Sequence, residues 1–132
     1  MKKSFVISIL IALSGCALEA APSTPPPSTP VFFKPKSAGL DQAAQAAIGA
    51  FANAANNQPT LPIFIVGTSE DKGDVAFSDA LSLARAQAVA TQLEQDGVRG
   101  DRLRIYAAGA VDMPKGLNKA QGARRVLMSL GN

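Results

Sequence analysis

Acidic residues gather in one short polar stretch of the chain, at Glu70, Asp71, Asp74 and Asp79. A pair of carboxylates flanking a sugar bond is what glycosidases use for hydrolysis. These four have no apolar enclosure around them to raise a pKa, and no nucleophile–base couple is recognisable elsewhere. Their spacing also differs from the alternating acids of an EF-hand. The sequence therefore predicts a solvated turn rather than a metal site, no enzyme and no cofactor.

Polar residues beside the acidic stretch have two interpretations each. From the residues alone, Arg85 is expected to pair with Asp79 or Glu70 as a solvated surface bridge, worth about 0–1 kcal/mol. Thr68 and Ser69 can hydrogen-bond a ligand or simply close the turn.

Two adjacent arginines, Arg124 and Arg125, stand near the C-terminus. They can flank a binding site or protect a sheet edge, since charged edge residues discourage pairing with other chains. The edge role is the prediction for one of them.

The composition excludes several classes of function. The chain of 132 residues has no histidine and one cysteine, so it forms no internal disulfide, His-containing metal site or Ser-His-Asp or Cys-His catalytic arrangement. There are 13 basic and 10 acidic residues, but Lys2 and Lys3 belong to a segment that we expect to be removed. The remaining 11 basic residues against 10 acidic ones give no support for nucleic-acid binding.

The first fifteen residues have the pattern of a bacterial export signal. Two lysines precede an uncharged run, FVISILIAL, which is too short to span a bilayer because a spanning helix needs roughly 20 residues. The run ends in Leu13-Ser14-Gly15-Cys16, which resembles the lipobox of bacterial lipoproteins. That resemblance implies that residues 1–15 are a signal peptide and that Cys16 carries lipid. Ala17 in place of aspartate implies transfer to the outer membrane. The alternative is a secreted protein with an incidental cysteine.

A proline-rich spacer follows the cysteine. Residues 16–30 include PSTPPPSTP, which has no apolar pattern and cannot pack a core. We expect an extended tether that holds the domain about 40 Å from the lipid, at roughly 3.1 Å per residue. A plain linker of unselected length is the alternative. Residues 31–132 form the single expected domain.

Hydrophobic periodicity predicts six elements in this domain. They are a strand over 31–33, a helix over 38–56, a buried strand over 61–66, a helix over 78–95, a strand over 102–107 and a strand over 124–130. Ser78 is the expected N-cap of the second helix, whose buried stripe should contain Leu81, Ala84 and Ala88. The order β-α-β-α-β-β predicts an α+β fold, a two-layer sandwich with two helices on one face of a small mixed sheet.

Three segments in this order resemble the OmpA-like C-terminal domain, the peptidoglycan-associated family. Residues 33–40 (FKPKSAGL) are similar to the family's opening, a strand phenylalanine followed by Ser-x-x-Leu. Residues 66–73 (VGTSEDKG) are similar to its glycine-bounded acidic loop, and residues 77–89 (FSDALSLARAQAV) to its Leu-Ser-x-x-Arg-Ala-x-x-Val helix. Residues 124–126 (RRV) match the Arg-Arg-Val near the family's end.

The resemblance implies a binding site for the diaminopimelate residue of the peptidoglycan stem peptide. The family's loop acid and helix base become Glu70 and Arg85. An arginine can clasp the ligand carboxylate with two parallel hydrogen bonds, and the acid can accept from the ligand ammonium. The other expected contacts are Thr68, Ser69, Asp71 and Ser78.

This chain departs from the family at the acid. Glu70 replaces an aspartate and is one methylene longer, which displaces the carboxylate by about 1.5 Å unless the loop shifts, at a greater cost in rotamer entropy. Asp71 can swing in instead. Phe77 and Ser78 replace a Tyr-Asn pair.

Two functions follow from the resemblance. One is an outer-membrane lipoprotein, anchored through Cys16, whose periplasmic domain binds peptidoglycan non-covalently, more weakly than the family's aspartate form. The alternative is a structural piece of an envelope-spanning machine (secretion, conjugation or motility) that has weakened or lost this binding and contacts other machine proteins. Neither involves nucleic acid.

Overall fold

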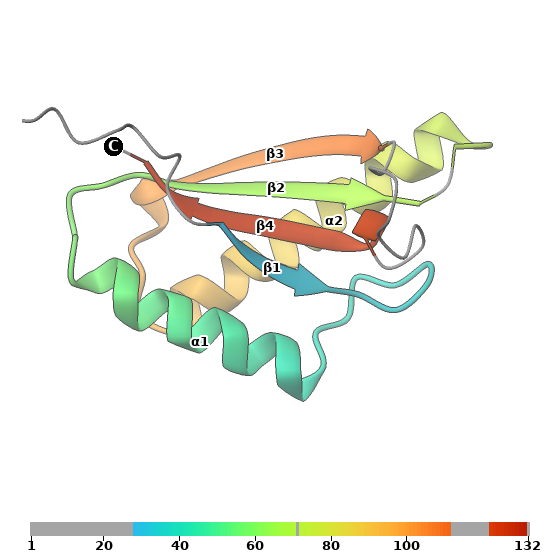
Figure 1. Ribbon diagram of the computed structural model, residues 1–132. Coiled ribbons are helices and arrows are strands. Elements are labelled where there is room, and N and C mark those ends of the chain that lie inside the picture. The colour runs from blue at the N-terminus through green and yellow to red at the C-terminus, as the bar shows by residue number, and fades with distance from the viewer. Residues whose placement is uncertain (1–27, 71, 112–121, 132) are drawn as a thin grey trace, which may run out of the picture.

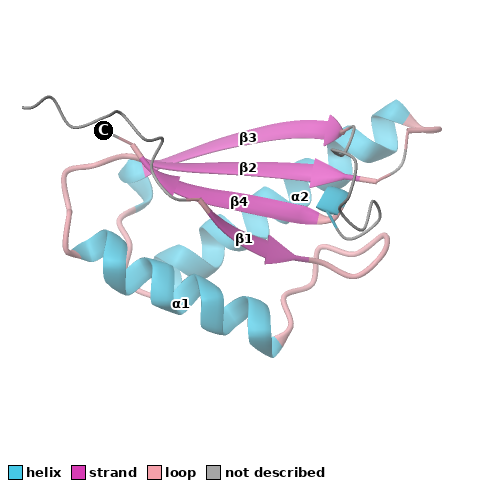
Figure 2. Ribbon diagram, in the orientation of Figure 1, coloured by secondary structure: helices cyan, strands magenta, loops and turns pink. Residues whose placement is uncertain are grey.

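A computed structural model describes residues 28–70, 72–111 and 122–131. It has a sheet layer and a helix layer, with both helices on the same face of the sheet (Figures 1 and 2). The elements in chain order are β1 (Thr29–Phe32), α1 (Gln42–Asn56), β2 (Ile63–Ser69), α2 (Val75–Gln95), a 3-10 turn (Gly100–Arg102), β3 (Leu103–Ala110) and β4 (Arg125–Leu130). The predicted α+β class and the order β-α-β-α-β-β are confirmed.

The strand order in the sheet is β1-β4-β2-β3. β4 runs antiparallel to both of its neighbours, and β2 pairs with β3 in parallel, so the sheet is mixed. The arrows of β1, β2 and β3 therefore point the same way in Figure 1. We name the end where these three strands begin the amino end of the sheet, and the end where they finish the carboxyl end.

One face of the sheet and both helices share a single apolar core. Successive side chains of a strand point to opposite faces of the sheet, so every second residue points inward. These residues meet the apolar stripes of α1 and α2. Completely buried members are Ile48, Ile63, Ile65, Val89, Leu93, Val126 and Met128. Every described element lies within residues 29–130, and the buried residues of this core lie between Val31 and Met128. Among the described residues no helix has the length and apolarity needed to cross a membrane.

Aspartates, and not the predicted residues, fix where the helices begin. Asp41 accepts a hydrogen bond from the Ala44 backbone N at 2.7 Å, so α1 starts at Gln42 instead of residue 38. Asp74 accepts from the Phe77 N at 2.9 Å and starts α2 at Val75. The prediction of Ser78 as the N-cap is therefore wrong: Ser78 lies inside the helix and is buried.

The buried stripe of α2 also differs from the prediction. Leu81 is buried as expected, but Ala84 is exposed and Ser82 and Arg85 take the inward positions. The helix turns its polar residues inward at this end because they find hydrogen-bond partners on the sheet.

Strand boundaries move as well. β1 begins at Thr29, so Thr29 and Pro30, predicted in the tether, pair with β4. β1 is an edge strand, where proline is tolerated because its missing N–H costs no interior ladder bond. β2 continues to Ser69, so Thr68 and Ser69 belong to a strand and not to a loop. β4 lies between β1 and β2, and the predicted edge role for Arg124 or Arg125 is wrong.

Candidate functional site

Glu70 and Arg85 meet at the carboxyl end of the sheet. Glu70 directly follows β2, and Arg85 lies in the middle of α2, which packs on β2 and β3. Arg85 Nη1 lies 3.0 Å from Glu70 Oε2, which makes a hydrogen-bonded ion pair. The acid and the base that the sequence analysis singled out therefore converge on one point of the molecule.

Arg85 is completely buried and bonded to two separate segments, the loop after β1 and the end of β2. Its Nε donates to the Ser37 carbonyl at 2.8 Å, Nη1 to the Thr68 carbonyl at 3.0 Å and Nη2 to the Lys34 carbonyl at 3.2 Å. Its guanidinium carbon also lies 5.4 Å from the centre of the Phe33 ring, within the range of a cation–π contact. A solvated surface bridge is therefore the wrong description of Arg85.

The hydrogen-bond capacity of Arg85 is nearly used up. A guanidinium has five N–H donors, and the four bonds to Glu70, Ser37, Thr68 and Lys34 leave one N–H on Nη2. Two parallel bonds to a ligand carboxylate, as the resemblance implies, are not available in this conformation. A ligand gains them only by replacing Glu70 or a backbone carbonyl.

Glu70 is held from two sides and stays partly exposed. Its Oε2 accepts from Arg85 and its Oε1 from the Lys36 backbone N at 3.3 Å, while 22% of its side chain remains accessible. Burial raises the pKa of Glu70, but the hydrogen bond from Arg85, the backbone hydrogen bonds and the arginine charge lower it more. The net pKa lies below the ordinary value of a glutamate, and the carboxylate is ionised at neutral pH.

The hydroxyls predicted around the ligand lie inside the domain. Thr68 Oγ1 contacts the Ala123 carbonyl at 2.7 Å and the Arg125 carbonyl at 3.0 Å, and so ties β2 to the start of β4. Ser69 and Ser78 are buried, with their hydroxyl oxygens 3.4 Å apart between β2 and α2. These three contacts hold the elements together and do not present hydroxyls to solvent.

Two predicted residues lie outside the described part of the chain, Asp71 and Cys16. Asp79, the other acid considered as a partner for Arg85, is exposed, and Glu70 is the acid bonded to Arg85.

Sequence reasoning missed the role of the loop after β1. This loop offers two carbonyls to Arg85 and the Lys36 N–H to Glu70. Lys36 has a φ of 53°, a left-handed conformation uncommon for a lysine, and it turns the backbone toward the ion pair. A cavity of about 200 Å³, lined by Lys34, Ser37, Gly39, Leu40 and Asp41, borders the same loop. The only sequence signal was the resemblance of residues 33–40, which carried no residue roles.

The mixed sheet, the two helices on one of its faces and the Glu70–Arg85 pair define a small α+β domain. Residues 32–126 match the OmpA family, and the chain belongs to that family. Comparison with curated protein sequences found no significant match.

Solved structures with the same fold come from several bacteria. The OmpA-like domain of FopA1 from Francisella tularensis is 22% identical, with a TM-score of 0.70 over 79% of this chain and 73% of that one. The peptidoglycan-associated lipoprotein from Burkholderia pseudomallei is 24% identical, with a TM-score of 0.69 over 78% and 90%. The C-terminal domain of Helicobacter pylori MotB is 21% identical, with a TM-score of 0.68 over 78% and 84%.

Proposed function

We propose that this chain is an outer-membrane lipoprotein whose periplasmic domain binds peptidoglycan non-covalently and so tethers the membrane to the cell wall. Membership of the OmpA family and the fold shared with a peptidoglycan-associated lipoprotein support this. The observation that carries the proposal is the Glu70–Arg85 pair, in which a partly exposed carboxylate lies against a buried guanidinium at the carboxyl end of the sheet. The ligand we propose is the diaminopimelate of the stem peptide, which bears an ammonium and a carboxylate on one side-chain end.

Binding takes place by exchange of partners. The ligand carboxylate takes the remaining Nη2 N–H of Arg85 and replaces Glu70 on Nη1. Glu70, released from the arginine but still beside it, accepts from the ligand ammonium. One internal ion pair is thereby replaced by two intermolecular ones, and charge-assisted hydrogen bonds of this kind are roughly twice as strong as neutral ones. The loss of the internal pair makes the net affinity lower than for a site with an unpaired arginine.

The anchor is proposed from the leader alone. Lipid on Cys16 attaches the chain to the outer membrane, because two or more acyl chains give lasting membrane binding. The residues between Cys16 and β1 serve as the tether.

The test is co-sedimentation of the purified domain with isolated peptidoglycan sacculi. Glu70→Gln keeps the side-chain size but removes the charge that receives the ammonium, and should weaken binding about tenfold, the equivalent of one charge-assisted hydrogen bond. Glu70→Asp draws the carboxylate back from Arg85 by about 1.5 Å. It should strengthen binding, since the arginine N–H becomes available to the ligand.

Asp79→Asn is the matched control, because it removes the same charge from an exposed position of α2 outside the pair. Its binding should equal that of the unmodified domain. A domain that does not sediment with sacculi, or a Glu70→Gln variant that binds like the control, would reject the proposed site.

One observation favours a second function, a structural piece of an envelope-spanning machine. Arg85 already has the carbonyls of Lys34, Ser37 and Thr68 as partners, so its role can be to lock the loop after β1 onto β2 and α2. This function predicts that sacculus binding is absent while a protein partner co-purifies from detergent-solubilised envelope.

A further inference from the structure

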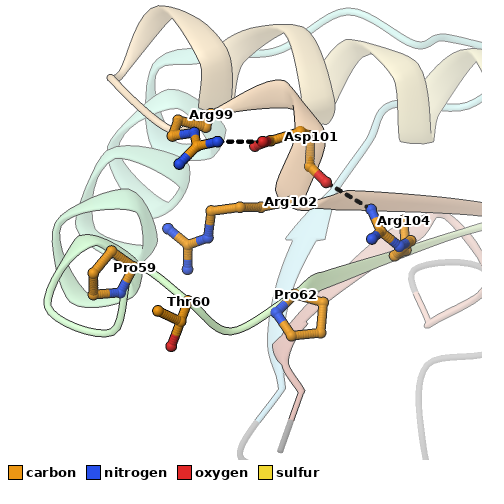
Figure 3. A pocket seen from close by; sticks show the side chains of 7 residues that line it. All are labelled: Pro59, Thr60, Pro62, Arg99, Asp101, Arg102 and Arg104. Atoms are coloured by element: carbon orange, nitrogen blue, oxygen red, sulfur yellow. Dashed lines mark hydrogen bonds and ion pairs between the residues drawn. The ribbon is translucent and has the colours of Figure 1, made fainter.

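A second charged pocket lies at the amino end of the sheet, away from Glu70 and Arg85. It has a volume of about 420 Å³ and is lined by Pro59, Thr60, Pro62, Arg99, Asp101, Arg102 and Arg104 (Figure 3). Pro62 and Arg102 directly precede β2 and β3, whereas Glu70 follows the last residue of β2. The length of β2, about 3.3 Å for each of its residues, separates the two sites.

The lining is strongly basic. Three of the seven residues are arginines and one is an acid, so the pocket carries an excess of two positive charges. The acid, Asp101, is already paired with Arg99. Figure 3 shows the Arg102 side chain reaching between Arg99 and the Pro59–Thr60 turn, with Arg104 on the side of Pro62. An anion is the ligand that such a pocket attracts.

Arg102 is the fixed part of the pocket. It is 7% exposed, and its Nε donates to the Leu61 carbonyl at 2.9 Å. Its Nη2 donates to the carbonyls of Ala55 at 3.1 Å and Gln58 at 2.8 Å, and so caps the end of α1. Nη1 makes only a long contact of 3.5 Å with Asn56 Oδ1. The guanidinium is therefore held rigidly, with donor capacity remaining on Nη1.

The other two arginines add donors at the rim. Arg99 uses Nη2 on Asp101, and Arg104 uses Nη1 on the carbonyls of Asp101 and Leu103. The Nε and the second terminal nitrogen of each have no acceptor among the residues that the structure describes. Guanidinium forks match the oxygen geometry of phosphate, and the Thr60 hydroxyl on the facing wall can donate as well.

The path of the chain indicates where the phosphate comes from. β1 is parallel to β2, so the chain enters the domain at Thr29 on the amino end, the same end as the pocket (Figure 1). We propose that this pocket binds the phosphate of anionic lipid headgroups in the membrane to which the chain is anchored. The choice of lipid phosphate as the ligand rests on the proposed anchor. Binding of the pocket to the membrane leaves the Glu70–Arg85 site facing away from the membrane.

The test uses the chain from residue 16 onward with Cys16→Ser, which keeps every described element and carries no acyl chain. Its co-flotation is measured with vesicles of phosphatidylcholine, with and without phosphatidylglycerol. Binding should require phosphatidylglycerol. Since a basic residue near an anionic surface contributes about fivefold to partitioning, Arg99→Gln and Arg104→Gln together should lower it about 25-fold. Lys34→Gln removes a charge from an exposed side chain at the opposite end and should lower it less than twofold.

Several outcomes would overturn the proposal. One is no flotation of the unmodified chain, and another is a loss of about fivefold with Lys34→Gln, the effect of one charge, which would make net charge the cause. A third is that the pocket binds inorganic phosphate but not vesicles. Phosphate binding is measured as saturating shifts of the Nε–H NMR signals of the pocket arginines. The arginine variants should still sediment with sacculi, and Glu70→Gln should still bind vesicles. Failure of one site is therefore distinguishable from failure of the other.

Discussion

Arg85 has the chemistry to bind a ligand carboxylate, but most of its hydrogen-bond donors are already bonded within the domain. Its position suits a ligand carboxylate, yet its side chain is fully buried and joins α2 to β2 and to the loop after β1. Removing it would leave those carbonyls without their donor and destabilise the domain. A loss of binding in an alanine variant could therefore come from lost stability. Glu70 is the better residue to change, because it is partly exposed and its substitution leaves the carbonyl partners of Arg85 in place.

The lowered pKa of Glu70 predicts a pH-dependent contribution to stability. A carboxyl that has a lower pKa in the folded state than in the unfolded state binds fewer protons when folded, so its contribution is present above the unfolded pKa. It is lost as the pH falls from about 4.5, the ordinary value for glutamate, through the lowered pKa of the folded state. At pH 7 we expect Glu70→Gln to unfold with about 1 kcal/mol less free energy than the unmodified domain. The difference should vanish at low pH.

Urea denaturation of both proteins from pH 7 down to pH 3 measures this difference. Glu94→Gln removes the same charge from an exposed position of α2 and is the control. A Glu70→Gln difference that stays constant with pH would contradict the ion-pair explanation, and a similar change in the control would assign the effect to net charge.

At the scale of elements, the site depends on how closely α2 approaches β2. The contact is made at Gly67, where a Cβ would lie 2.0 Å from the backbone oxygen of Ser82. Ser82 lies one turn before Arg85, so this contact also sets the distance from Arg85 to the end of β2. The same region contains a register shift between β2 and β3 at Gly67 and Ser69.

Gly67→Ala should therefore be severely destabilising, because the clash is with backbone that cannot rotate away. We expect a loss of about 3 kcal/mol in the free energy of unfolding, measured by urea denaturation. Gly49→Ala in α1 is the matched substitution, since its Cβ would meet nothing closer than 3.8 Å. It should stabilise the domain by about 0.5–1 kcal/mol, the gain from replacing glycine inside a helix. Equal effects of the two substitutions would show that the close contact does not govern the packing.

The order of the elements could be predicted because hydrophobic periodicity reports burial directly, and residues such as Ile48, Ile65 and Val126 occupy the expected inward positions. The helix starts could not, because Asp74 and Ser78 are both good caps and only the packing of Ser78 against Ser69 decides between them. The burial of Arg85 was equally hidden. Three of its partners are backbone carbonyls, which every residue possesses and no sequence pattern marks.

At the scale of the whole molecule, the domain has two chemically different ends. The chain enters β1 at the amino end, where Pro62 and Arg102 of the arginine pocket precede β2 and β3, and the Glu70–Arg85 pair lies at the carboxyl end, after β2. For the proposed anchored protein, the tether sets how far the Glu70–Arg85 end can lie from the membrane whenever the arginine pocket is not bound to lipid. The length of the tether should then affect binding to the wall only in the anchored protein.

Deleting residues 20–27 of the proline-rich spacer tests this dependence. The deletion shortens an extended tether by about 25 Å, at roughly 3.1 Å per residue, and touches no described element. In cells, we expect less of the shortened lipoprotein to be recovered with sacculi after gentle lysis, because the anchored domain no longer reaches the wall. In a Cys16→Ser background the same deletion should have no effect, since an unanchored domain reaches the wall by diffusion. Equal recovery of the long and short anchored forms would show that tether length does not limit contact with the wall, and a loss in the unanchored background would show that the deletion damages the domain itself.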